Sequence, residues 1–117
     1  MISFIYNLVF FEKKEKKMVR HVVMWRFKDA ALGKTKSENM TVVRDALYSL
    51  VSVIPEIKRM EIGFDFSCTE ASMDFMLLTE FDTAEDLKIY AVHHEHLKVA
   101  EYVRAVVDSR VVVDSEF

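Results

Sequence analysis

Hydrophobic residues along this chain follow two different periods, and the order of those periods limits the folds that the chain can adopt. Residues 19–28, VRHVVMWRFK, alternate between two faces and are rich in β-branched and aromatic side chains, as in a β-strand. Apolar residues lie on both faces at its centre, so the strand should be covered on both sides. From Met40 to Ile54, apolar residues recur at steps of three and four, which indicates an amphipathic helix that ends at Pro55.

The second half of the chain repeats this alternation of patterns. Residues 57–66 and 73–81 are predicted strands, joined by the turn SCTEAS. Asp82 or Thr83 is a suitable N-cap for further helix, which should continue from about His94 to Val106 before a short strand through Val111–Val113. The order β-α-β-β-α-β predicts an α+β ferredoxin-like domain, with four antiparallel strands and the helices on one face.

The face of this sheet opposite the helices should also be apolar. It would carry Val22, Met24, Met76 and Leu78, a patch that is too apolar to remain in water. A second copy of the sheet is the simplest cover. The sequence therefore predicts a face-to-face homodimer.

The chain begins with an apolar segment that does not belong to this pattern. We expect the 117 residues to form one domain, with residues 1–17 as an N-terminal arm and residues 18–117 as the folded part. The run MISFIYNLVFF is shorter than the roughly 20 residues of a membrane span, and it lacks the basic start and cleavage site of a secretory signal. An arm rich in Phe, Ile and Val should bury that surface, and we expect it to pack against the partner subunit.

Charge, cysteine content and motifs narrow the partners and the compartment. The net charge of −3 gives no reason to expect a nucleic-acid partner, and no membrane association is predicted. Cys68 is the only cysteine in the sequence, so no disulfide can form within one chain, which favours the reducing cytoplasm. The sequence contains no glycine-rich phosphate loop and no Gly-x-Ser-x-Gly motif, and we predict no cofactor.

Four segments together are similar to the stress-responsive dimeric α/β-barrel (Dabb) family. They are HVVMWRFK with His21 at its start, IPEIKRMEIGFDFS, YAVHHEHLKVAEYV and the closing strand VVVDSEF. The resemblance runs from about Val19 to Asp114 and implies two ferredoxin-like subunits whose sheets together form a barrel. The family's usual form of the third segment is Tyr-x-x-His-Pro-x-His. Here His94 replaces the proline, so residues 83–106 could run more continuously as a helix.

Three histidines lie close together in the third segment. On one helix, Tyr90, His93 and His96 would share a side and His94 would turn away. In a plant member of the family that cyclises a linear polyketide, the positions of Tyr90 and His96 are catalytic and that of His21 lines the pocket. The resemblance implies that His96 is a general base and that Tyr90 hydrogen-bonds a carbonyl or developing enolate. The predicted pocket between sheet and helices consists of His21, Val23, Trp25, Val43, Leu47, Phe75, Leu77 and His93.

Three functions fit these residues. The prediction is a homodimer that binds a small apolar molecule in this pocket. The alternatives are a cofactor-free enzyme, similar to a polyketide cyclase or a lyase, and a purely structural stress-related dimer. A metal site built on His93, His96 and Glu95 would need a further ligand from His21 or Asp108. No local spacing supplies that ligand, and we predict no metal.

Overall fold

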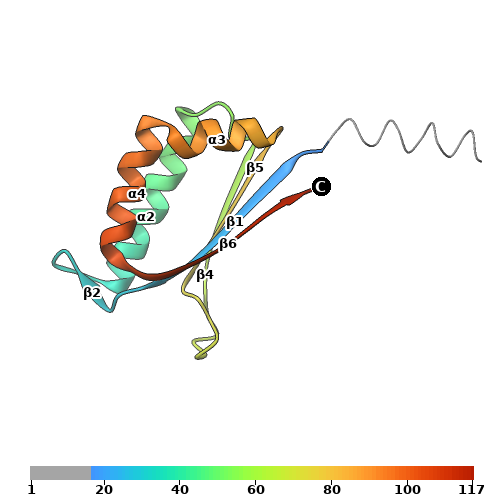
Figure 1. The fold of residues 1–117 in the computed structure, drawn as a ribbon. Helices are drawn as coiled ribbons and strands as arrows, with labels where there is room; N and C mark the ends of the chain where they lie inside the picture. Colours follow the sequence, from blue (N-terminus) through green and yellow to red (C-terminus); the bar gives the residue numbers. More distant parts are fainter. Residues whose placement is uncertain (1–16) are drawn as a thin grey trace, which may run out of the picture.

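The computed structural model describes residues 17–117. The prediction for the N-terminal arm lies, except for Lys17, outside the described residues. Within them, a four-stranded sheet is covered on one face by helices (Figure 1). The strands are β1 (Val19–Phe27), β4 (Arg59–Phe64), β5 (Phe75–Phe81) and β6 (Val107–Glu116). The helices are α2 (Lys36–Ser49), the 3-10 turn η1 (Leu50–Ser52), α3 (Ala84–Val92) and α4 (His94–Val106), and a short hairpin joins β2 (Ala30–Ala31) to β3 (Lys34–Thr35).

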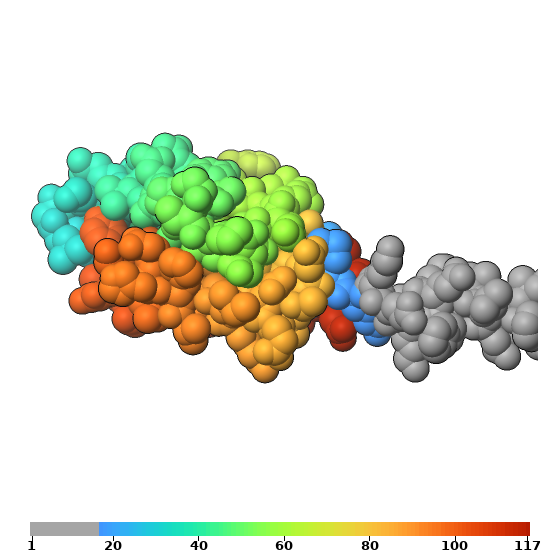
Figure 2. All heavy atoms as spheres, turned by 90° about the horizontal axis from the view of Figure 1, so that it is seen from above, coloured from blue at the N-terminus to red at the C-terminus, as the bar shows by residue number. Residues whose placement is uncertain are grey.

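The strands of the main sheet are all antiparallel, in the order β4-β5-β1-β6. This arrangement confirms the ferredoxin-like α+β class predicted from the sequence. Helices α2 and α4 lie side by side over the sheet (Figure 2). None of the helices within residues 17–117 is both long and apolar enough to cross a membrane.

Local capping chemistry sets where the helices begin. Helix α2 starts before the apolar stripe at Met40, because Thr35 and Glu38 form a capping box. The Thr35 hydroxyl accepts from the Glu38 N–H at 3.2 Å, and the Glu38 carboxylate accepts from the Thr35 N–H at 2.9 Å. Of the two N-caps predicted for the next helix, Thr83 is the one observed, and its hydroxyl accepts from the Asp86 N–H at 3.0 Å.

The last strand is longer than the predicted segment Val111–Val113. Strand β6 pairs with β1 from Val19 to Phe27, with one register shift between Arg26 and Phe27. The backbone N–H and C=O groups of β1 that do not pair with β5 pair with β6. This pairing includes the polar residues before and after the valines, so the strand extends through them.

The core lies between the sheet and the helices. Alternate residues of β1 and β5 point into it, as the period-two pattern predicts, and Val23, Phe27 and Leu77 are almost fully buried. Val43 of α2 and Phe75 of β5 lie deep in this core, where Phe75 stacks on Phe27 at 5.6 Å between ring centroids.

The opposite side of the sheet, which we call the outer face, carries no helix (Figure 1). At its centre, Met24 of β1 pairs directly with Met76 of β5 and with Val111 of β6. Both methionines are only half-buried. At one end of this face, the Glu80 carboxylate pairs with Arg20 at 2.8 Å and with Arg59 at 3.1 Å. The outer face is therefore apolar at the centre and charged at one end.

Candidate functional site

A cavity of about 470 Å3 lies between the helix-facing side of the sheet and the α3–α4 pair. Its walls come from β1, β5, β6, α2, α3 and α4, and most of the residues in them are apolar. Small-molecule pockets in proteins usually measure 300–1,000 Å3 and combine apolar walls with a few polar groups. The size and lining of this cavity both fall within that description.

Most of the residues predicted for the pocket reach this cavity, and three do not. The residues present in its wall are His21, Val23, Trp25, Leu47, Leu77, Tyr90 and His96. Val43 and Phe75 are absent from the wall, and both lie almost fully buried in the core. His93 is absent because its side chain serves the backbone at the start of α4.

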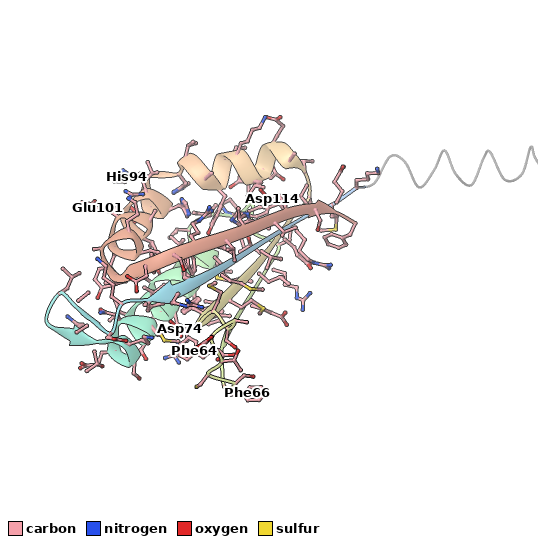
Figure 3. The ribbon with its side chains drawn as sticks, turned by 60° about the horizontal axis from the view of Figure 1, so that its bottom comes forward. Phe64, Phe66, Asp74, His94, Glu101 and Asp114 are labelled. Atoms are coloured by element: carbon pink, nitrogen blue, oxygen red, sulfur yellow. The ribbon has the colours of Figure 1, made fainter. Side chains whose placement is uncertain are left out.

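His93 divides the helical segment despite the missing proline. Its backbone is extended, with φ −62° and ψ 136°, so α3 ends at Val92 and α4 begins at His94. The His93 Nδ1 accepts a hydrogen bond from the Glu95 N–H at 3.1 Å, which makes His93 the N-cap of α4. The expectation of a more continuous helix is wrong, because this side-chain cap replaces the proline as the helix boundary. His94 stays on the solvent side of the joint (Figure 3).

The break brings Tyr90 and His96 into contact. Their ring centroids are 4.3 Å apart, and Tyr90 is almost fully buried in the last turn of α3. The His96 Nδ1 lies 3.0 Å from the Ala91 carbonyl oxygen. A carbonyl can only accept, so Nδ1 carries the proton and Nε2 keeps its lone pair. His96 therefore presents a basic nitrogen beside the Tyr90 ring.

Burial sets the protonation of this pair. It lowers the pKa of His96, and the charges of His21, Arg110 and His93 lower it further against the opposing effect of the Ala91 hydrogen bond. Burial also raises the pKa of the Tyr90 phenol, and the nearby Arg110 charge opposes that rise. At neutral pH the arrangement thus combines a neutral imidazole with a protonated phenol.

His21 completes the polar end of the cavity. It lies directly opposite Asp114 in the β1–β6 pairing, and its Nδ1 hydrogen-bonds the Asp114 carboxylate. Asp114 is on the helix side of β6 (Figure 3). The ring of His21 meets the Tyr90 ring edge-on at 6.4 Å between centroids. A carboxylate in this position fixes both the orientation and the tautomer of an imidazole.

Sequence reasoning missed the contribution of β6 to the site. Asp114 was noted only as part of the closing strand, and the wall residues Arg110, Ser109 and Val107 were not predicted. Only the pairing register of β6 with β1 could have placed these residues in the site.

No three His, Cys, Asp or Glu side chains within residues 17–117 are grouped so that they could hold a metal ion.

A four-stranded antiparallel sheet with helices on one face and a partly polar cavity beneath them defines the class of small ferredoxin-like domains. A family model described as the stress responsive A/B barrel domain, Dabb, matches residues 19–117, and the chain belongs to this family.

Solved structures with the same fold include a dimeric ferredoxin-like protein of unknown function from Bacteroides fragilis. It is 30% identical, covers 86% of this chain and 96% of its own, and has a TM-score of 0.69. A dimeric ferredoxin-like protein from Thermobifida fusca is 22% identical over 88% of this chain and 93% of its own, with a TM-score of 0.75. The hydroxynitrile lyase of Passiflora edulis is 18% identical over 86% and 93%, with a TM-score of 0.73. The last two similarities establish the fold alone. A search of curated proteins found no match to this sequence.

Proposed function

We propose that the protein is a homodimer whose subunits each bind a small, largely apolar molecule between the sheet and the helices. The observation that carries this proposal is the 470 Å3 cavity, in which the polar groups of His21, Tyr90 and His96 gather at one end of a mostly apolar wall. Small-molecule sites are usually built this way, because apolar contact supplies affinity and a few polar groups fix the orientation.

The polar groups of the cavity are free to meet a ligand. The His96 Nδ1 bonds the Ala91 carbonyl, and Nε2 forms no hydrogen bond within residues 17–117. His21 likewise uses Nδ1 for Asp114. Both histidines line the cavity, so a molecule in it can reach the second nitrogen of either ring. The size of the cavity and the free nitrogens therefore support ligand binding over a purely structural dimer.

The homodimer is supported by the outer face. Val113 is 64% exposed there in the single subunit, and Phe66 at the tip of the β4–β5 loop is 93% exposed (Figure 3). A hollow of about 300 Å3 beside Phe66 is lined by Met24, Met73 and Met76. Exposed apolar surface of this extent is typical of an interface. The relatives from Bacteroides fragilis and Thermobifida fusca are described as dimeric. The cytoplasmic location and the absence of a nucleic-acid partner stay predictions from the sequence.

Trp25 offers a direct test of ligand binding. It is the only tryptophan in the sequence and it lines the cavity, so an occupant should change its fluorescence. Decan-1-ol, an uncharged apolar probe, is expected to shift or quench this emission in a saturable titration. Native mass spectrometry of the freshly purified protein should also show a co-purified small molecule. If decan-1-ol produced no saturable change and the protein carried no bound molecule, the binding proposal would be wrong.

A second candidate function is cofactor-free proton transfer, and the Tyr90–His96 contact favours it. The neutral His96 can remove a proton from carbon next to a carbonyl, while the Tyr90 hydroxyl donates a hydrogen bond to the oxygen that gains charge. The imidazole then holds the proton as a cation until it returns it. This chemistry would suit a cyclase or a lyase and needs no group beyond the chain's own residues.

We expect the wild-type protein to catalyse exchange of the α-protons of undecan-2-one in deuterated water, measured by NMR. Because burial lowers the pKa of His96, the base stays neutral below the ordinary imidazole value of about 6.5, and the rate should fall with acid only below that pH. The rate should vanish in His96→Ala and persist in His94→Ala. Exchange that never exceeds the buffer rate, or equal losses in the two variants, would remove the enzymatic alternative.

A further inference from the structure

One charged residue of the cavity wall, Arg110, has no use in the proposed site. In the pairing of β6 with β1 it lies opposite Trp25, so it belongs to the helix-facing side of the sheet, where the cavity is. Its positive charge is close enough to act on both Tyr90 and His96. The same wall contains Arg104, from the last turn of α4.

The other arginines of the described chain each have a partner. Arg20 and Arg59 pair with Glu80, Arg44 pairs with Asp45, and Arg26 donates to the carbonyls of Glu70 and Ser72. Arg104 and Arg110 bond to no residue within 17–117. Arg104 sits at the C-terminal end of α4, where a cation stabilises the helix dipole without any ligand. Arg110 is exposed on the edge strand β6, and its register opposite Trp25 turns it to the cavity side of the sheet.

The remaining charges around the cavity do not neutralise Arg110. Asp108 lies in the same wall but forms no ion pair with either arginine among the described residues. Asp114 is engaged by His21. The cavity wall therefore carries two guanidinium groups and one free carboxylate, beside an apolar interior formed by Val23, Leu77 and their neighbours.

We infer that the ligand of this cavity is an amphipathic carboxylic acid, with its hydrocarbon part in the apolar interior and its carboxylate on Arg110. The planar guanidinium matches a carboxylate through two parallel hydrogen bonds, which a lysine could not offer. The inference rests on the proposed function, because it specifies the class of molecule that the same cavity takes.

The test compares decanoate with decan-1-ol, two probes of equal chain length that differ in charge, by Trp25 fluorescence at pH 8. Decanoate is expected to bind the wild-type protein about tenfold more tightly, and this preference should weaken as salt is added. Arg110→Gln should remove the preference while leaving decan-1-ol affinity within about twofold of wild type. Arg44→Gln, which alters an arginine remote from the cavity, should change neither affinity.

The outcomes separate this inference from the proposal beneath it. If decan-1-ol binds but decanoate binds no better, or if Arg110→Gln keeps the preference for the acid, the cavity takes apolar molecules and the carboxylate assignment is wrong. If neither probe binds, both the inference and the binding proposal fail. Arg110→Lys should recover only part of the preference, because an ammonium keeps the charge and loses the paired hydrogen bonds.

Discussion

Met24→Asp is expected to convert the proposed homodimer into monomers. Met24 lies at the centre of the outer face, where it pairs with Met76 and Val111. In the dimer its side chain would lie between the two sheets, so an aspartate there would lose its water without gaining a partner. Burying an unpaired polar group costs roughly 2 kcal/mol or more. Two copies per dimer would weaken association by about a thousandfold or more.

Light scattering and sedimentation at micromolar concentration should show this change as a halving of the mass. The isolated subunit should remain folded by circular dichroism, because Met24 is only half-buried in a single chain and an aspartate there can reach water. Met76→Asp, made separately, should act in the same way, since combining the two would place like charges opposite each other within one sheet.

The matched control for this prediction is Val53→Asp. Val53 is half-exposed and follows the 3-10 turn after α2, away from the outer face. It adds the same charge and should leave the dimer intact. If Met24→Asp and Met76→Asp both stayed folded dimers of wild-type affinity, the outer face would not be the interface.

The element order and the faces of the strands could be predicted because they depend on local periodicity. Val23 and Trp25 alternate with Val22 and Met24 along β1, and this pattern alone assigns the first pair to the core and the second to the outer face. Helix boundaries were predictable where a cap residue was recognised, as at Thr83, and not where the cap preceded the apolar stripe, as at Thr35.

The site was predictable in part because its decisive features are not periodic. A helix carrying Tyr90, His93 and His96 places all three on one side, whereas the structure uses His93 to cap α4 and turns His96 back toward Tyr90. A competition between a side-chain cap and a continuing helix is decided by a single hydrogen bond, and hydrophobic spacing does not report it.

The residues contributed by β6 were out of reach for a different reason. Asp114 meets His21 and Arg110 meets Trp25 only because β6 pairs with β1 in one register. A shift of one residue would turn both side chains to the outer face. The valines at 111–113 are apolar on both faces of the strand, so they leave that register unspecified in the sequence. The register is fixed by contacts between segments far apart in the sequence, as in the pair His21 and Asp114, which are 93 positions apart.

Ala100→Phe is expected to abolish ligand binding while preserving the fold. Ala100 lies on α4 with its side chain in the cavity wall, and the space of about 470 Å3 beside it can receive a phenyl ring. The ring would occupy the volume that a bound apolar molecule needs. Filling an empty apolar space also adds contacts in the folded state, so the melting temperature should stay at or above that of the wild type. The Trp25 fluorescence titration with decanoate should then lose its saturable change.

The control for this substitution lies on the same helix. Ala105 is exposed and outside the cavity wall, so Ala105→Phe adds an identical ring without reducing the space for a ligand. It should keep decanoate affinity within about twofold of wild type. If Ala100→Phe also bound decanoate with unchanged affinity, the probe would occupy another place, such as the hollow beside Phe66 on the outer face. Repeating the titration with Met24→Asp would decide this, because that substitution changes the hollow and leaves the walls of the cavity intact.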